Sequence, residues 1–265
     1  MPTEWRIHTL STGDLLLPGF HESGDWIPTH AWALTDGARW VLVDSGMPSV
    51  AEMRAKWKVE ARGGGAEALR GALARVGAAP EQIETLILTH LHFDHAWNLE
   101  LFPQAQVLLQ RDELFHAIDP VPTQRLYYAK PSYMPLLERR RPAALRLLDG
   151  DADILPGLSV MKAPGHTPGM QVVLANTARG TVGLVSDLGE EYSAWFPADP
   201  RATKAPSNAL RDAFRPGPIR SESEMTYSGS MRRVLTRADI IVPAHDDRIP
   251  RTMPDDWWAV PEASG

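Results

Sequence analysis

The chain contains no cysteine among its 265 residues. Disulfide bonds, thiolate nucleophiles and sulfur-ligated zinc or iron sites are therefore excluded, and any metal must be held by histidine and carboxylate side chains. Long hydrophobic runs are also absent, because the longest fall far short of the roughly 20 residues that a membrane span needs. Hydrophobic residues nevertheless make up 43% of the chain, which is ordinary for a globular protein.

Positive charge is in deficit, since 27 Lys and Arg face 33 Asp and Glu, for a formal net charge of −6. A general nucleic-acid binder needs an excess of Lys and Arg for its phosphate contacts, so this class is not expected. The first ten residues include Glu4 and Arg6 and lack an apolar segment, which argues against a signal peptide. We therefore expect a cytoplasmic protein with no nucleic-acid or membrane partner.

Hydrophobic periodicity predicts strands in both halves of the chain, each set followed by a helix. The expected strands are 5–10, 14–17, 31–34, 39–44, 84–89, 105–109, 158–162, 171–174, 181–186 and 240–242. The expected helices are 66–76, 111–118 and 227–234. This pattern favours an α/β fold with two sheets and helices outside them, as one domain over residues 1–265. Residues 120–142, with five prolines and three tyrosines, are interpreted as an insertion of helical turns that covers the substrate.

A cluster of metal-binding side chains follows the expected strand 84–89. His90 and His92 alternate along the end of that strand, so both imidazoles point the same way. Asp94 and His95 follow where the chain must turn, and they face a second position nearby. Imidazole and carboxylate ligands suit zinc or a similar divalent ion. The alternative, a loop of exposed polar residues, does not account for this density of ligands.

Three further residues end strands or lie in tight turns. His166 lies in Gly-His-Thr-Pro-Gly, Asp187 follows strand 181–186, and His245 follows strand 240–242. Alone, each has an ordinary explanation, as a surface or capped histidine, a helix cap or a solvated strand end. Asp44 in Val-Asp-Ser-Gly is explained equally well as a turn residue or as an acceptor that orients a ligand histidine.

Taken in order, these motifs resemble the metallo-β-lactamase superfamily over residues 30–246, including the turn Val-Leu-Val-Asp-Ser-Gly at 41–46. The resemblance implies an αββα sandwich with two divalent metal ions at one edge of the sheets. It assigns His90, His92 and His166 to one ion, Asp94, His95 and His245 to the other, and Asp187 to a bridge between them. Zinc is the expected metal, with manganese, cobalt and iron as alternatives.

Two divalent ions lower the pKa of a bridging water and polarise the bond under attack, so the expected reaction is metal-assisted hydrolysis. Within the superfamily the chain most resembles the quorum-quenching N-acyl homoserine lactonases. The resemblance is carried by Thr-His-Leu-His-Phe-Asp-His-Ala at 89–96, Leu-Phe-Pro at 101–103 and Gln-Arg-Asp-Glu-Leu at 110–114. Those lactonases carry a tyrosine three positions beyond the bridging aspartate, where this chain has Glu190. The expected catalytic residues are Asp94, Asp187 and, as the nearest tyrosine, Tyr192.

Large side chains in the loops are expected to surround the metal edge and to favour a neutral, partly apolar lactone or ester. They are Phe20, Trp26, Met47, Phe93, Trp97, Tyr127, Tyr128 and Tyr133. The simpler alternative is that each packs under a loop.

Three other functions remain open at this point. A phosphodiester or phosphotriester hydrolase shares the two-ion chemistry but has no basic cluster near the motifs. A thioester hydrolase of the glyoxalase II kind lacks an evident basic site for a glutathione carboxylate. The non-enzymatic alternative is a metal-stabilised binding or sensor protein. A homodimer is possible through Trp257 and Trp258, which are equally able to pack on their own chain.

Overall fold

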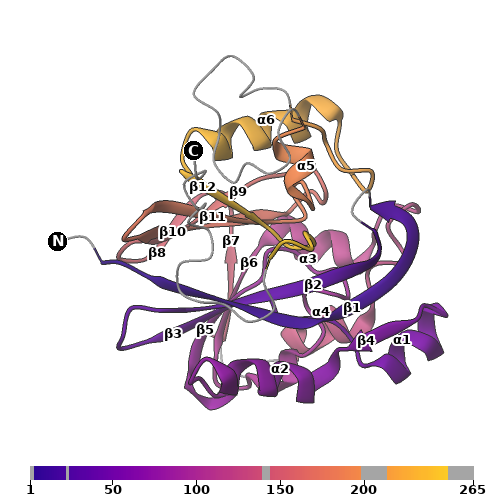
Figure 1. The fold of residues 1–265 in the computed structure, drawn as a ribbon, viewed down its shortest axis with the longest axis horizontal. Helices are drawn as coiled ribbons and strands as arrows, with labels where there is room; N and C mark the ends of the chain where they lie inside the picture. Colours follow the sequence, from indigo (N-terminus) through magenta and orange to yellow (C-terminus); the bar gives the residue numbers. More distant parts are fainter. Residues whose placement is uncertain (1–2, 22–23, 139–143, 198–213, 250–265) are drawn as a thin grey trace, which may run out of the picture.

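Two β-sheets pack face to face and helices cover both outer faces (Figure 1). This computed structural model describes residues 3–21, 24–138, 144–197 and 214–249. The arrangement confirms the expected α/β sandwich of two mixed sheets. Within the described residues no helix is long and apolar enough to cross a lipid bilayer.

The first sheet has seven strands in the order β4-β1-β2-β3-β5-β6-β7. Strands β1, β2 and β3 pair antiparallel, and β3, β5, β6 and β7 run parallel. Their bounds are β1 (Arg6–His21), β2 (Gly24–Thr35), β3 (Trp40–Val43), β4 (Ala61–Gly63), β5 (Ile83–Ile87), β6 (Gln106–Gln110) and β7 (Leu145–Leu148).

The second sheet has five strands in the order β12-β11-β10-β9-β8. Only β11 and β12 are parallel in it. Their bounds are β8 (Ala152–Leu155), β9 (Leu158–Lys162), β10 (Gln171–Thr177), β11 (Gly180–Ser186) and β12 (Ile240–Pro243).

Helices lie on the outer face of each sheet, with α1 and α2 beneath the first sheet in Figure 1 and α5 and α6 above the second. The helices are α1 (Val50–Trp57), α2 (Gly65–Arg75), α3 (Arg111–Ile118), α4 (Lys130–Leu137), α5 (Tyr192–Trp195) and α6 (Glu224–Leu235). Short 3₁₀ turns are η1 (Pro80–Gln82) and η2 (Leu99–Leu101).

Two large hydrophobic clusters stabilise this arrangement. One joins the facing sides of the two sheets and continues to α6, with fully buried Trp32, Val172 and Met231. The other packs α2, α3 and α4 on the first sheet, and Leu69 and Leu73 of α2 belong to it. Their spacing is the i, i+4 repeat from which the helix is predicted.

The prediction of separate strands at 5–10 and 14–17 was wrong. The residues that suggest a turn instead form a β-bulge in β1, where the register with β2 shifts between Ser11 and Gly13. Helices α1 and α5 and strands β4, β7 and β8 were not predicted, because no clear apolar repeat marks them. In α1, for example, only Met53 is buried, so no apolar repeat marks the helix.

Candidate metal centre

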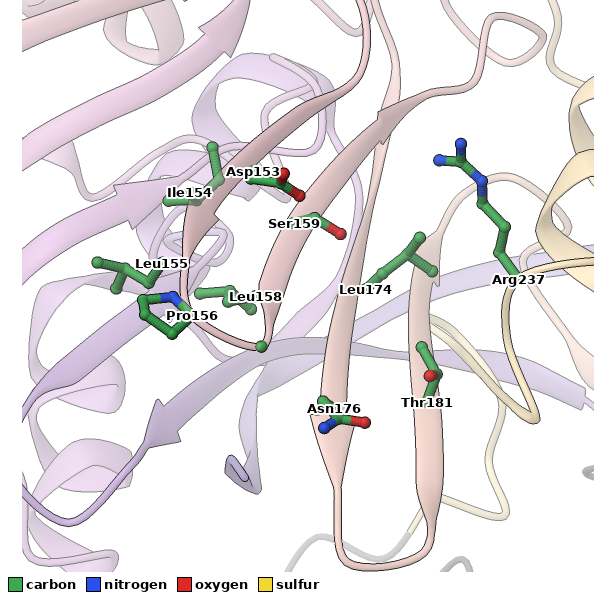
Figure 2. A pocket seen from close by; sticks show the side chains of 11 residues that line it. Asp153, Ile154, Leu155, Pro156, Leu158, Ser159, Leu174, Asn176, Thr181 and Arg237 are labelled. Atoms are coloured by element: carbon green, nitrogen blue, oxygen red, sulfur yellow. The ribbon is translucent and has the colours of Figure 1, made fainter. Parts of the chain in front are cut away.

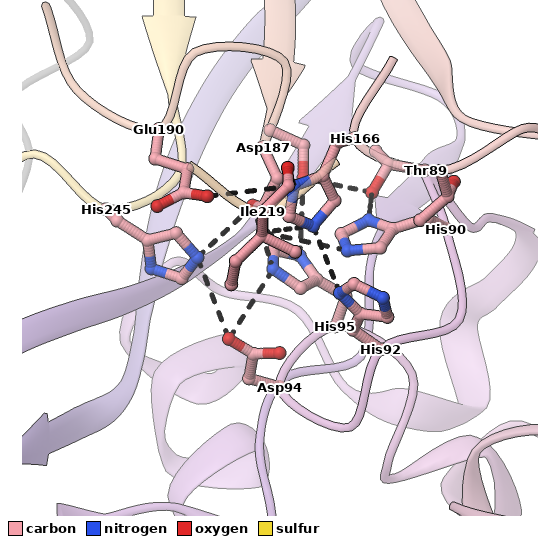
Figure 3. A network of polar contacts seen from close by, with 12 residues as sticks. Thr89, His90, His92, Asp94, His95, His166, Asp187, Glu190, Ile219 and His245 are labelled. Atoms are coloured by element: carbon pink, nitrogen blue, oxygen red, sulfur yellow. Dashed lines mark hydrogen bonds and ion pairs between the residues drawn. The ribbon is translucent and has the colours of Figure 1, made fainter. Parts of the chain in front are cut away.

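The strand ends of both sheets converge on one edge of the sandwich. Strands β3 and β5 are parallel, so Asp44 after β3 and the cluster from His90 after β5 meet at the same edge. In the second sheet, parallel β11 and β12 bring Asp187 and His245 together. The loop between β9 and β10 adds His166. All seven side chains that the motif order picks out therefore lie together (Figure 3).

One group of donor atoms consists of His90, His92, His166 and Asp187. His166 Nε2 lies 3.0 Å from His92 Nδ1 and 3.2 Å from Asp187 Oδ2. His90 Nε2 lies 3.7 Å from the same carboxylate oxygen. All four side chains are buried.

A second group consists of Asp94, His95 and His245, and it faces the other oxygen of Asp187. Asp187 Oδ1 is 3.0 Å from His95 Nε2 and 3.2 Å from His245 Nε2. Asp94 Oδ2 is 3.7 Å from each of these nitrogens. Asp187 thus directs one oxygen at each group, as a bridging carboxylate would.

The residues fit a metal ion in each group. Ligands about 2.0–2.1 Å from a tetrahedral zinc ion lie about 3.3 Å apart, and the closest donor atoms here are 3.0–3.7 Å apart. In the described part of the chain, Nε2 of His90 is buried without a hydrogen-bond partner. Buried polar atoms are rarely left so, and a metal ion would satisfy it.

Four of the five histidines are held by their other ring nitrogen, which fixes the nitrogen that faces the centre. His95 Nδ1 lies 2.9 Å from Asp44 Oδ2, so Asp44 is placed to orient a ligand histidine. The remaining partners are Thr89 Oγ1 for His90, the Pro28 carbonyl for His245 and the Ile219 carbonyl for His166.

Burial lowers the pKa of His90 and of His92 well below the ordinary value for histidine, so both rings are neutral. Burial acts in the same direction on His95 and His245, but the carboxylates of Asp187 and Asp94 outweigh it and raise both pKa values. Burial would raise the pKa of Asp187, but the surrounding histidines hold it well below its usual range. Without metal, protons on His95 and His245 therefore compensate part of the negative charge of Asp187 and Asp94.

The family model described as the metallo-beta-lactamase superfamily matches residues 24–245. The chain belongs to this superfamily. An N-acyl homoserine lactonase of Bacillus cereus is 28% identical over 186 residues, which are 67% of this chain and 66% of that one. The human metallo-beta-lactamase domain-containing protein 1 is 33% identical over 80% of this chain and 60% of its own length. The chain thus spans slightly less than two thirds of these curated relatives.

A solved structure confirms the superfamily fold. An N-acyl homoserine lactone hydrolase, with the product N-hexanoyl-L-homoserine bound at its catalytic metal centre, superimposes with a TM-score of 0.69. The match covers 93% of this chain and 95% of that one at 20% sequence identity.

A cavity of about 190 Å³ opens beside the superfamily motifs, with Asp94, Asp187 and His245 at its base. Its walls are mainly apolar and come from β1, β2, the end of α1 and the segment before α4. The other described lining residues are Leu15, Leu17, Ile27, Trp57, Val59, His92, Phe93, Leu126, Tyr127, Glu190 and Ile219. Trp57 stacks on Phe93 with ring centroids 4.3 Å apart and donates Nε1–H to the Leu126 carbonyl.

A larger cavity, of about 810 Å³, lies on the second sheet between the β8–β9 hairpin and strands β10 and β11 (Figure 2). Leu158, Leu174 and Arg237 are among its lining residues, and no histidine lines its described part. Asp153 is the one carboxylate in this described lining and belongs to neither donor group, so size alone does not make the cavity the functional site of a superfamily member.

The structure places two of the expected pocket residues, Phe93 and Tyr127, on the cavity wall. The other expected residues are not in the described lining, and their contact with a substrate stays a prediction. Trp26 lies under the Arg62 guanidinium, Met47 is fully buried, Trp97 lines a different cavity, Tyr128 hydrogen-bonds Glu113, and Tyr133 packs on the outer side of the first sheet. The side chain of Phe20 and residues Trp257 and Trp258 lie outside the described residues.

Tyr192 also lies elsewhere than expected. Helix α5 directs its ring into the central hydrophobic cluster, under the Arg248 guanidinium, and only 1% of the residue is exposed. Glu190 lines the cavity instead. The geometry therefore gives no support to Tyr192 as the group that assists at the substrate oxygen.

The sequence did not single out the residues that support the ligand loops. Tyr227 of α6 donates its hydroxyl to the Asp187 carbonyl and accepts the Gly189 N–H, which fixes the loop after β11. In the sequence this tyrosine indicates only the apolar face of a helix. Glu113 of α3 is a second such residue; the sequence places it in the phrase Gln-Arg-Asp-Glu-Leu at 110–114 but assigns it no role.

Proposed function

We propose that this protein is a dinuclear metal-dependent hydrolase that opens a neutral lactone or carboxylic ester, with N-acyl homoserine lactones as the first candidates. The observation that carries the proposal is the pair of donor groups that share Asp187 at the base of a mainly apolar cavity. The resemblance to N-acyl homoserine lactonases supports the choice of substrate.

His90, His92 and His166 would hold one ion, Asp94, His95 and His245 the other, and Asp187 would contribute one oxygen to each. Zinc is the proposed metal, because nitrogen donors with carboxylate oxygens suit it, and manganese, cobalt or iron would also bind. Two such ions would supply a nucleophile from water at neutral pH and polarise the carbonyl under attack.

The protein's own groups bind and orient the substrate. Asp94 reaches the cavity beside the donor atoms, where it is placed to orient the attacking water and to take its proton. Burial, Glu190 and Asp94 raise the pKa of Tyr127, so its hydroxyl stays protonated and is available as a hydrogen-bond donor. Leu126 and Tyr127 belong to residues 120–142, and we infer that this insertion covers the bound substrate.

The lining favours a neutral substrate over an anionic one. Among its described residues there is no Lys or Arg, while Asp94, Asp187 and Glu190 are acidic. A phosphodiester or a glutathione thioester would bring negative charge without a basic partner on these walls. An acyl chain and a lactone ring would instead bury apolar surface against Trp57 and Phe93.

A parallel panel tests the proposal. The purified chain is loaded with zinc, its metal content is measured, and it is assayed on an N-acyl homoserine lactone, an aryl ester, an aryl phosphodiester and an S-acyl glutathione. We expect two ions per chain and the highest kcat/KM on the lactone or the ester. Turnover of the phosphodiester alone would contradict the substrate class, and two bound ions with no turnover of any compound would favour a binding or sensor protein.

A matched pair of variants separates the metal centre from general effects. Asp187→Ala removes the shared carboxylate, and we expect loss of metal and of turnover. Asp149→Ala removes a carboxylate that forms an exposed ion pair with Arg111, and we expect neither loss. Full activity of metal-free Asp187→Ala would refute the mechanism.

A further inference from the structure

Glu113 is a fully buried carboxylate on α3 that belongs to neither donor group. A buried carboxylate is costly unless hydrogen bonds satisfy it, so its partners show what the residue holds together. Glu113 accepts three hydrogen bonds, from three separate segments of the chain.

Two of the three bonds reach the loops that carry one donor group. Glu113 Oε1 accepts the backbone N–H of Leu91 at 2.9 Å, between His90 and His92. Its Oε2 accepts the Thr167 hydroxyl at 2.5 Å, next to His166. One carboxylate therefore joins the two loops whose three histidines face the same position.

The third bond reaches the cavity wall. Glu113 Oε1 also accepts the hydroxyl of Tyr128 at 2.8 Å. The neighbouring Tyr127 lines the cavity, its carbonyl accepts the Phe93 N–H at 3.0 Å, and its ring centroid lies 5.0 Å from that of His92. The position of this wall thus depends on the same side chain as the donor group.

Close packing reinforces this connection. A Cβ added at Gly169 would lie 2.1 Å from the backbone nitrogen of Glu113, so the His166 loop rests directly on α3. Gln124 adds a parallel link, because it donates to the His166 carbonyl at 2.6 Å and its side-chain oxygen lies 2.9 Å from His116 Nε2 on α3.

We propose that Glu113 is a positioning residue that couples the donor group of His90, His92 and His166 to the Tyr127 wall of the cavity. The inference rests on the two-ion centre of the proposed function and not on the identity of the substrate. The two connections of Glu113 can be removed separately. Thr167 connects Glu113 to the donor group, and Tyr128 connects it to the wall.

Four variants test the two sides. Thr167→Val removes the link to the His166 loop, and Tyr128→Phe removes the link to the wall. Glu113→Ala removes both, whereas Glu113→Gln keeps an acceptor for Leu91 and Tyr128 and places an amide donor opposite the Thr167 hydroxyl oxygen. Asp112→Ala is the matched control, since Asp112 is the preceding residue of α3 and pairs with Lys162 in an exposed ion pair.

Zinc affinity measures the link between Glu113 and the donor group without any substrate. Chelator competition is measured in a His245→Ala background, which weakens the second group, and in a His166→Ala background, which weakens the first. We expect Thr167→Val and Glu113→Ala to lower zinc affinity about tenfold in the His245→Ala background only. Tyr128→Phe, Glu113→Gln and Asp112→Ala should stay close to their parent protein.

Hydrogen–deuterium exchange measures the link between Glu113 and the cavity wall. We expect faster exchange of the Phe93 and Tyr127 amides in Tyr128→Phe and Glu113→Ala, by about two- to tenfold for the loss of one hydrogen bond. Thr167→Val should leave the exchange rates of these amides unchanged. If Glu113→Ala does not fold, the zinc affinity of Thr167→Val alone tests the link to the donor group.

The outcomes distinguish this inference from the proposed function. Two zinc ions in the wild type, with unaltered affinity in Thr167→Val and unaltered exchange in Tyr128→Phe, would overturn the inference alone. An equal loss of zinc affinity in both backgrounds, or a similar loss in Asp112→Ala, would show that Glu113 has only a general structural role. That result would overturn the inference as well. A wild type that binds no zinc would overturn the proposed metal centre together with the inference.

Discussion

The substitution Asp44→Asn tests how the second donor group is oriented. In the wild type, Asp44 Oδ1 accepts the Thr89 N–H at 2.8 Å and Oδ2 accepts His95 Nδ1–H at 2.9 Å. A carboxylate only accepts hydrogen bonds, so His95 carries a hydrogen on Nδ1, and Nε2 is the nitrogen that faces Asp187 and the second donor group. Asparagine keeps the Thr89 bond and turns an amide donor toward Nδ1.

The substituted amide favours the other tautomer of His95, with the hydrogen on Nε2, and that tautomer does not bind metal. Loss of such an orienting partner typically lowers metal affinity about 10- to 100-fold, which corresponds to about 1.4–2.8 kcal/mol. Asp44 has a φ of 62°, a left-handed conformation that asparagine adopts readily, so the backbone should stay in place.

Zinc titration against a competing chelator measures the effect. We expect one of the two binding constants, that of the group containing His95, to fall 10- to 100-fold in Asp44→Asn, while the other changes little. Ser45→Ala is the control, because the Ser45 hydroxyl donates to the backbone carbonyl of His95 and not to its ring, and both constants should match the wild type. Two unaltered constants in Asp44→Asn would refute the assigned orientation of His95.

Three further predictions follow from the same geometry. Because the pKa values of His95 and His245 are raised, both hold protons that metal binding must displace. Zinc affinity should therefore fall as the pH falls through these pKa values. Calorimetry in buffers of different ionisation enthalpy should detect proton release near pH 7. A heat of zinc binding that is the same in all buffers would contradict the predicted proton release. Zinc removal should lower the melting temperature, since each site filled at about 100 times its Kd contributes about 2.7 kcal/mol, or roughly 5–10 °C, in a chain of this size. Unchanged melting after chelation would show that neither site is filled. Gly189→Ala should destabilise the protein by about 1–3 kcal/mol in urea denaturation, because Gly189 has a φ of 80° and its added Cβ would lie 2.5 Å from Trp195 Nε1. Gly37→Ala, with a φ of 90° and no neighbour within 4 Å, isolates the backbone contribution, and equal losses in the two would exclude the contact.

The ligand side chains were predictable because their chemistry is local. His90, His92, Asp94 and His95 lie within six consecutive positions, and alternation along an extended chain is enough to orient the first two. His166, Asp187 and His245 are ambiguous alone, and only their order after successive strands relates them to the cluster. Parallel pairing of β11 with β12 then explains why Asp187 and His245 meet.

The cavity walls were less predictable because they depend on long-range packing. Leu15 and Ile27 lie on β1 and β2, and both come to the metal edge through a bulged register that the sequence does not indicate. Aromatic side chains were only a partial guide, since Phe93 and Tyr127 line the cavity whereas Trp26 and Tyr128 contact Arg62 and Glu113. Glu113 stands in the phrase Gln-Arg-Asp-Glu-Leu at 110–114, but its role was not predicted, because only the fold brings its three donors together.

One measurement tests the central claim most directly. Metal-free protein is titrated with zinc from zero to two equivalents per chain, and opening of an N-acyl homoserine lactone is followed by acid release at each step. The proposed two-ion centre, with Asp187 shared between its halves, predicts negligible turnover without metal and full turnover only as the second equivalent binds. Full turnover by the metal-free chain, or by Asp187→Ala at any loading, would contradict it.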